Sequence, residues 1–101
     1  MLIKKPDMQK FEELKKKIMP VLIKHDVVHA GIFGSTATGE ENETSDVDLL
    51  VELVDGKTLF DLVALKLDLE EAVNRKVDVV TYRSLHPLIK ESVLEEEIKI
   101  L

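Results

Sequence analysis

The 101-residue sequence contains no cysteine. This absence excludes disulfide bonds, thiolate nucleophiles and thiolate metal sites, so any metal ion must be held by oxygen or imidazole ligands. It is also compatible with a reducing cytoplasm. The sequence has one tyrosine, Tyr82, directly after an apolar segment. We therefore expect Tyr82 to pack against the protein or to form a hydrogen bond, rather than to be a site of self-modification.

Long hydrophobic runs are also missing. No segment approaches the ~18 apolar residues that a membrane-spanning helix needs, and the N-terminus lacks the apolar stretch of a signal peptide. Basic residues are outnumbered, with 14 against 20 acidic residues and a formal net charge of -6. This balance opposes direct binding to nucleic acid but is compatible with a nucleotide whose phosphates are neutralised by cations. We expect a soluble, cytoplasmic protein that binds neither membranes nor nucleic acid directly.

The length predicts a single domain that spans residues 1–101. A chain of this size can form one core, but it is too small for a catalytic domain together with a separate substrate domain. We therefore expect another chain to help recognise any second substrate. The sequence leaves open whether the protein acts as a monomer, a homo-oligomer or a hetero-oligomer.

Hydrophobic periodicity predicts a helix followed by two strands. Between Met8 and His25 the apolar residues recur at helical spacing, and Pro20 inside this pattern is expected either to kink the helix or to divide it. Residues 27–33 and 47–54 are predicted to be strands. Between them, residues 35–38 are expected to form a turn or the first turn of a short helix, and residues 39–45 a polar loop.

The second half of the chain adds a helix, a strand and a last helix. Thr58 and Asp61 have the spacing of a capping box, and the apolar residues after them predict a helix that ends near Asn74. Residues 76–81 are predicted to be the third strand. Either Ser84 or His86 can cap the last helix.

The end of the chain completes the predicted fold. Pro87 is expected in the first turn of the last helix, where proline is tolerated. The apolar tail, residues 98–101, is expected to pack on the core or to add an edge strand. The order helix, strand, strand, helix, strand, helix predicts an α/β (α+β) fold, in which a small mixed β-sheet is covered by helices on one face.

A Gly-Ser turn followed by two carboxylates carries most of the functional information. Gly34 and Ser35 follow the first predicted strand, and Asp46 and Asp48 lie eleven and thirteen residues after Ser35. Residues two apart on a strand share a face, so both aspartates are expected to point toward the Gly-Ser turn while the alternate apolar residues pack on the other face. This pattern predicts a divalent-metal site beside a phosphate site.

Asp78 is a third candidate because it lies in the middle of an apolar strand. If Val77 and Val79 face the core, Asp78 lies on the other face of the sheet. A third strand beside the second would place Asp78 next to Asp46 and Asp48. Three carboxylates this close repel one another unless cations compensate their charge, and oxygen ligands of this kind suit Mg²⁺.

These residues resemble the signature of the polymerase-beta-type nucleotidyltransferases, which is Gly34-Ser35, ten intervening residues and then Asp46-Val47-Asp48. The shortness of the chain and the segments 45–51, 62–70 and 75–81 are similar to the minimal nucleotidyltransferases in particular. The resemblance extends from about residue 27 to residue 101. It implies the nucleotidyltransferase fold and the transfer of a nucleoside monophosphate from a nucleoside triphosphate, with pyrophosphate leaving.

The same resemblance implies a role for each matching residue. Gly34 and Ser35 would contact the terminal phosphates of ATP, helped by the N-terminus of the helix that follows. Asp46 and Asp48 would bridge two Mg²⁺ ions. Asp78 would bind the second ion and help deprotonate the hydroxyl group that attacks the α-phosphorus.

One departure from the family pattern concerns a positive charge. Many members carry Ala-Arg-Gly where this sequence has Ala37-Thr38-Gly39, so a cation that contacts phosphate is missing. Lys57 and Arg75 are the alternative cations, although the sequence places neither of them in the site.

The resemblance also implies a partner. Minimal nucleotidyltransferases are commonly the antitoxin of a toxin–antitoxin pair whose toxin is a HEPN ribonuclease, and some of them adenylylate a tyrosine of that toxin. The expected function is therefore Mg²⁺-dependent AMP transfer from ATP to a HEPN toxin. Two alternatives stay open, namely a non-catalytic antitoxin that neutralises the toxin by binding, and a nucleotidyltransferase that acts on a small molecule.

Overall fold

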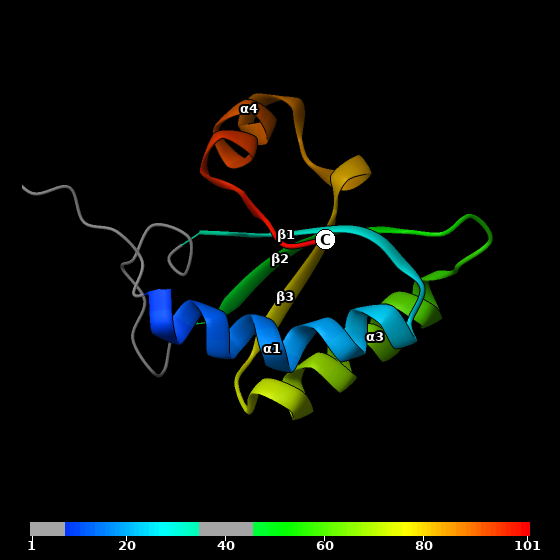
Figure 1. Ribbon diagram of the computed structural model, residues 1–101. Coiled ribbons are helices and arrows are strands. Elements are labelled where there is room, and N and C mark those ends of the chain that lie inside the picture. The colour runs from blue at the N-terminus through cyan, green and yellow to red at the C-terminus, as the bar shows by residue number, and fades with distance from the viewer. Residues whose placement is uncertain (1–7, 35–45) are drawn as a thin grey trace, which may run out of the picture.

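A computed structural model describes residues 8–34 and 46–101 of the chain (Figure 1). The elements, in order, are α1 (Met8–Lys24), β1 (Val27–Phe33), β2 (Val47–Leu53), α3 (Leu59–Val73), β3 (Val77–Thr81), the 3₁₀ turn η1 (Tyr82–Ser84), α4 (Pro87–Glu96) and β4 (Ile98–Lys99). The described strands form one sheet in the order β3-β2-β1-β4. β1 runs antiparallel to β2 and β4, and β2 runs parallel to β3, which confirms the predicted mixed sheet.

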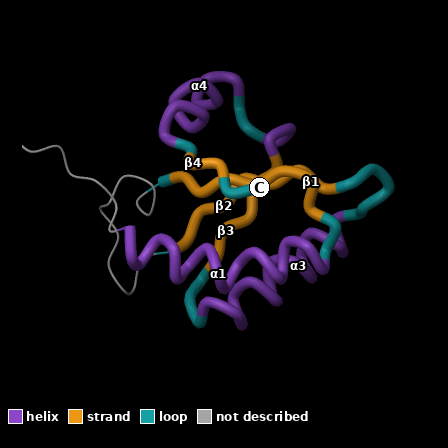
Figure 2. Tube along the Cα trace, viewed as in Figure 1, coloured by secondary structure: helices purple, strands orange, loops and turns teal. Residues whose placement is uncertain are grey.

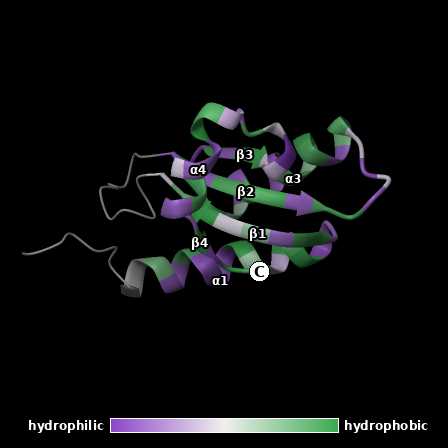
Figure 3. Ribbon diagram, turned by 90° about the horizontal axis from the view of Figure 1, so that it is seen from above, coloured by the Kyte–Doolittle hydropathy of each residue, from purple (hydrophilic) through white to green (hydrophobic). Residues whose placement is uncertain are grey.

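The hydrophobic core lies between the sheet and the helices α1 and α3. On the sheet, Val47, Leu49 and Val51 of β2 are fully buried, and Figure 3 shows that β2 is largely hydrophobic along its length. Ile18 of α1 and Leu65 of α3 are equally inaccessible and belong to the same cluster. The alternate residues of β2 therefore face these helices, as the twofold periodicity of the strand predicts.

Helix α4 lies on the opposite face of the sheet from α1 and α3, as Figure 2 shows. The expectation that helices cover only one face was therefore wrong. Leu50 explains the difference, because it points away from the main core and is nevertheless fully buried. On that side η1 contacts β2 and α4 contacts β1. A buried apolar residue on each face of β2 requires a covering layer on both sides.

Local signals position the helix ends as predicted. Asp61 accepts a hydrogen bond of 2.7 Å from the backbone N–H of Thr58, and α3 ends at Asn74, whose φ of 54° is left-handed. Of the two candidate caps for α4, His86 is the one observed: its Nδ1 accepts a hydrogen bond from the N–H of Leu88, and Pro87 occupies the first turn. Pro20 lies inside α1 without dividing it.

The tail of the chain both adds a strand and contributes to the core. β4 pairs with β1 through Ile98 and Lys99, and the backbone of Leu101 exchanges hydrogen bonds of 3.1 Å with that of Ala30. Ile100 is buried in the main cluster. Among the described helices, none has the length and apolar character needed to cross a membrane.

Candidate active site

Gly34 and Asp48 meet where β1 ends and β2 begins. The antiparallel register places Phe33 opposite Asp48, so Gly34 follows directly beside that carboxylate. Gly34 has a φ of 73°, and a Cβ atom at this position would overlap the Asp48 carboxylate. Glycine is therefore required here for two reasons, its left-handed backbone and the space that Asp48 occupies. The expected approach of Asp48 to the Gly-Ser turn is confirmed at Gly34.

Asp48 and Asp78 lie directly opposite each other on the parallel strands β2 and β3. Val77 is 1% exposed and Val79 packs against the core, so Asp78 projects from the other face of β3, as expected. Asp48 projects from that same face of β2. Asp46 precedes β2 by one residue and is exposed. The fold therefore gathers the three aspartates at one end of the sheet.

The environment of Asp48 disfavours its ionised form. The pKa of Asp48 is raised to about 6. Burial is the largest cause, followed by the charge of Asp78, a hydrogen bond with Asp78 and the charge of Asp46. A carboxylate held beside a second carboxylate and against a glycine backbone is poorly compensated by the protein alone. This is the situation in which a bound cation is favourable.

The three aspartates offer the oxygen ligands that Mg²⁺ prefers, but they do not form a complete cage. Within residues 8–34 and 46–101, no three acidic or histidine side chains converge as a ready metal-binding cluster. Mg²⁺ usually keeps several waters and takes other ligands from nucleotide phosphates. Asp48 and Asp78 therefore fit an ion that arrives together with a nucleotide better than a site preformed by the protein.

Two residues of the sequence-based prediction lie outside the described part of the chain. These are Ser35, expected to contact phosphate, and Thr38, which stands where the resemblance implies that many family members carry arginine. Of the alternative cations, Lys57 lies beyond the opposite end of β2 and its Nζ is 3.3 Å from Asp26 Oδ2. Lys57 is therefore not a substitute for the arginine. Arg75 lies two residues before the start of β3, at the same end of the sheet as Asp78.

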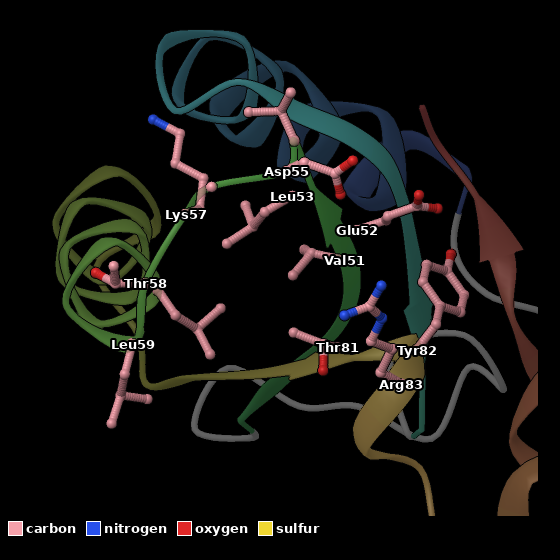
Figure 4. A pocket seen from close by; sticks show the side chains of 13 residues that line it. Val51, Glu52, Leu53, Asp55, Lys57, Thr58, Leu59, Thr81, Tyr82 and Arg83 are labelled. Atoms are coloured by element: carbon pink, nitrogen blue, oxygen red, sulfur yellow. The ribbon is translucent and has the colours of Figure 1, made fainter.

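A cavity at the other end of the sheet had no signal in the sequence. It has a volume of about 530 Å³ and lies where β2 and β3 end, next to the start of α3 (Figure 4). Leu53, Leu59 and Leu62 give it apolar walls, and Thr81 and Arg83 of the third strand and η1 complete it. The sequence could not predict this cavity because its walls come from segments that are separated along the chain.

Tyr82 forms a hydrogen bond, as its position predicted. Its hydroxyl donates to Glu97 Oε2, and burial together with this carboxylate raises the pKa of Tyr82. The side chain of Glu97 passes over Gly31 of β1, where a Cβ atom would collide with it. This contact connects η1 to the segment between α4 and β4.

Comparison with known proteins shows relatives along most of the chain. The model of the family described as "Polymerase beta, Nucleotidyltransferase" matches residues 16–101. A protein of Methanocaldococcus jannaschii, provisionally named protein adenylyltransferase MJ0435, is 54% identical over 88% of this chain and 96% of its own length. Protein adenylyltransferase MntA of Thermococcus cleftensis is 37% identical over 69% of this chain and 71% of its own length.

Solved structures share the fold. A structure provisionally described as a minimal nucleotidyltransferase has a TM-score of 0.78 and 39% identity, and the match covers 91% of this chain and 94% of that one. A toxin–antitoxin structure with AMP-PNP has a TM-score of 0.75 at 24% identity, over 86% of this chain and 72% of that one. A complex of tri-AMPylated Shewanella oneidensis HEPN toxin with MNT antitoxin has a TM-score of 0.70 at 21% identity, over 89% and 71%. The last two structures are less than 25% identical to this chain, so the comparison with them shows a shared fold alone.

Proposed function

The chain belongs to the polymerase-beta-type nucleotidyltransferase family, and on that basis we propose that it transfers AMP from ATP to a hydroxyl group of a partner protein. The observation that carries this proposal is the placement of Asp48 and Asp78 side by side, against the glycine that ends β1. Relatives named protein adenylyltransferases support the choice of AMP and of a protein acceptor.

The proposed reaction is an in-line displacement at the α-phosphorus. The acceptor oxygen forms a new bond to that phosphorus, the bond from phosphorus to the pyrophosphate oxygen breaks, and pyrophosphate leaves with the electron pair. The acceptor proton passes to the Asp78 carboxylate and then to solvent. Gly34, and Ser35 beyond the described residues, offer backbone N–H groups to the terminal phosphates.

Two Mg²⁺ ions are part of this proposal. Asp46 and Asp48 would hold both ions between them, and Asp78 would contribute to the second. When bound, the ions supply positive charge that offsets both the carboxylates and the phosphates. The raised pKa of Asp48 supports this assignment, because the protein itself does not supply that charge.

The proposed partner is a HEPN toxin, and the proposed biological role is that of its antitoxin. Complexes of HEPN toxins with MNT antitoxins share this fold, and in one of them the toxin carries three AMP groups. We further propose tyrosine as the residue that receives AMP. A chain of this size presents few surfaces for a second substrate, so a partner that supplies part of the site suits it.

A second candidate is an antitoxin that acts by binding alone. The replacement of the family arginine by Thr38 favours it, because that change removes a phosphate-binding charge.

Labelling separates these two candidates. The purified chain is incubated with α-labelled ATP and Mg²⁺ in lysate from cells that lack its gene, beside the Asp46→Asn/Asp48→Asn protein. We expect a labelled protein band with the wild type alone, which identifies the acceptor. Label in the folded double mutant would contradict the assigned roles. No label, together with no ATP binding in calorimetry, would favour the antitoxin that acts by binding alone.

A further inference from the structure

β3 carries Asp78 and also forms an open edge of the sheet. Among the described elements its one neighbouring strand is β2. Edge strands in soluble proteins are usually protected by lysine, proline or a covering segment, because their unpaired backbone groups attract other strands. The five residues of β3, Val77–Thr81, include neither lysine nor proline.

The backbone groups on this edge can be identified from the register. The C=O of Lys76 accepts a 2.9 Å hydrogen bond from the N–H of Val47, so Lys76 faces β2. Because successive residues of a strand direct their backbone groups to opposite edges, Asp78 and Val80 also face β2, whereas Val77, Val79 and Thr81 face outward.

Both ends of the outward edge are already satisfied. The N–H of Val77 donates a 3.1 Å hydrogen bond to Glu70 Oε2. The C=O of Thr81 accepts a 3.0 Å hydrogen bond from Ser84 Oγ. Between these two points, the C=O of Val77, both groups of Val79 and the N–H of Thr81 have no strand partner among residues 8–34 and 46–101. This is a short set of donors and acceptors that matches one extended peptide segment.

We propose that the outward edge of β3 docks an extended segment of the acceptor protein as an added strand, with the residue that receives AMP opposite Asp78. This inference rests on the proposed function and specifies how the acceptor binds. Opposite residues on neighbouring strands project from the same face, with Cβ atoms about 4.5–5.5 Å apart. The acceptor side chain would therefore lie on the face that carries Asp48 and Asp78, next to the proposed base.

The cavity beyond the end of β3 gives the added strand a second contact. Thr81 lines this cavity, and it is three residues after Asp78, so its side chain projects from the α3 face of the sheet. A residue opposite Thr81 would project from that same face toward the apolar walls formed by Leu53 and Leu62. The docked segment should thus carry a hydroxyl residue and, three positions away, an apolar residue.

Amide hydrogen exchange tests the docking directly. The Asp46→Asn/Asp48→Asn chain is measured alone and in complex with the acceptor identified by labelling, and calorimetry establishes that the complex has formed. We expect exchange at the Val79 and Thr81 amides to slow at least tenfold in the complex. The Asp78 and Val80 amides, which already face β2, should change little.

A matched pair of variants provides a second test. Val79→Pro removes the outward N–H without removing a hydrogen bond to β2, and proline is tolerated on edge strands. Val79→Ala shortens the side chain but keeps the N–H. We expect Val79→Pro to raise the KM for the acceptor at least tenfold with the KM for ATP unchanged, and Val79→Ala to change neither KM more than about twofold.

The outcomes are distinct. A formed complex in which Val79 and Thr81 exchange as fast as in the free chain overturns the docking mode and leaves AMP transfer standing. Equal effects of Val79→Pro and Val79→Ala also overturn it, and if the proline variant does not fold, hydrogen exchange decides. Protection that rises with the chain's own concentration, without acceptor, would assign the edge to a second copy. A chain that labels no acceptor removes the proposed function and the docking mode together.

Discussion

Gly34 has no side chain, and this allows the Asp48 carboxylate of the candidate active site to lie directly against its backbone. Its left-handed φ and its closeness to the Asp48 carboxylate are separate constraints, and Gly56 shares only the first. Gly56 has a φ of 94°, but nothing lies within 4 Å of the position that a Cβ atom would take. The two glycines therefore provide a matched comparison. A side chain at either position strains the backbone, but only a side chain at position 34 collides with Asp48.

We expect Gly34→Ala and Gly56→Ala each to lower the free energy of unfolding by about 1–2 kcal/mol, because both place a side chain on a left-handed backbone. Gly34→Ala should in addition reduce AMP transfer by about two orders of magnitude, because it displaces a carboxylate that must lie within reach of the phosphates. Urea denaturation and a transfer assay measure the two effects. Equal transfer by both variants would contradict this role of Gly34.

The raised pKa of Asp48 has a consequence for stability without metal. Its value is 3.8 in the unfolded chain and about 6 in the folded one, so the ionised form is disfavoured by folding. Well below pH 3.8 the carboxyl is protonated in both states and this cost to stability is absent. The cost grows as the pH rises through the unfolded pKa toward about 6, and it is complete well above pH 6.

Asp48→Asn should therefore stabilise the metal-free protein at pH 8 and much less at pH 4. The pKa rise from 3.8 to about 6 corresponds to at most about 3 kcal/mol, and partial exposure of Asp48 reduces this to about 1–2 kcal/mol. Urea denaturation in the presence of a chelator measures the difference, with Asp55→Asn in an exposed turn as the control. A gain that is the same at both pH values would mean that the carboxylate charge is not its cause.

At the scale of elements, a polar contact joins the two helices that cover the core. His25, just after α1, has its Nε2 2.6 Å from Asp68 Oδ2 of α3, and Lys24 Nζ lies 3.4 Å from the same oxygen. The hydrogen bond with His25, and secondarily the charge of Lys24, lower the pKa of Asp68. The contact sets how α1 and α3 lie against each other at one end.

Asp68→Asn should lower the melting temperature at pH 7. A lowered pKa means that the ionised Asp68 stabilises the fold above its ordinary value of 3.8, and that this contribution is lost as the pH falls through the lower folded value. The difference between wild type and variant should therefore shrink below pH 4. Thermal unfolding followed by circular dichroism measures it, with Lys24→Gln as the milder control. A difference that persists undiminished at pH 3 would point to lost packing instead.

Elements with strong local patterns were predictable, and those that depend on distant contacts were not. The Thr58–Asp61 box, the turn at Asn74 and the alternation along β2 each follow from a few neighbouring residues. The contact of His25 could not be predicted from its own segment, because its partner Asp68 is 43 residues away along the chain. The side of the sheet that α4 covers likewise depended on Leu50, whose burial is set by the whole fold.

At the scale of the whole molecule, the two ends of the sheet differ in chemistry. Asp46, Asp48 and Asp78 lie at the start of the parallel strands, and the cavity, which has both apolar and polar walls, lies where these strands end. The sequence predicted the first end because its residues recur at a recognisable spacing. The sequence did not decide whether Arg75 or Lys57 could replace the missing arginine. In the fold these two residues lie at opposite ends of the sheet, Arg75 at the carboxylate end and Lys57 at the cavity end.

This separation gives a prediction about nucleotide binding. Arg75→Gln should raise the KM for ATP severalfold, because Arg75 lies at the proposed phosphate end while residue 38 is threonine. Lys57→Gln should leave this KM unchanged. Steady-state transfer assays at varied ATP measure both. If Lys57→Gln has the larger effect, the nucleotide lies at the cavity end and the assignment of the site is reversed.

The two edges of the sheet also differ. β4 covers the outer side of β1, and β4 itself is only two residues long and ends in the exposed Lys99. Very short strands and lysine both resist further pairing. Continuous assembly through sheet extension requires two edge strands that can pair on every subunit, whereas the described strands of this sheet provide one. Through its described strands, each copy of the chain therefore offers one edge, that of β3, to which a further strand can be added.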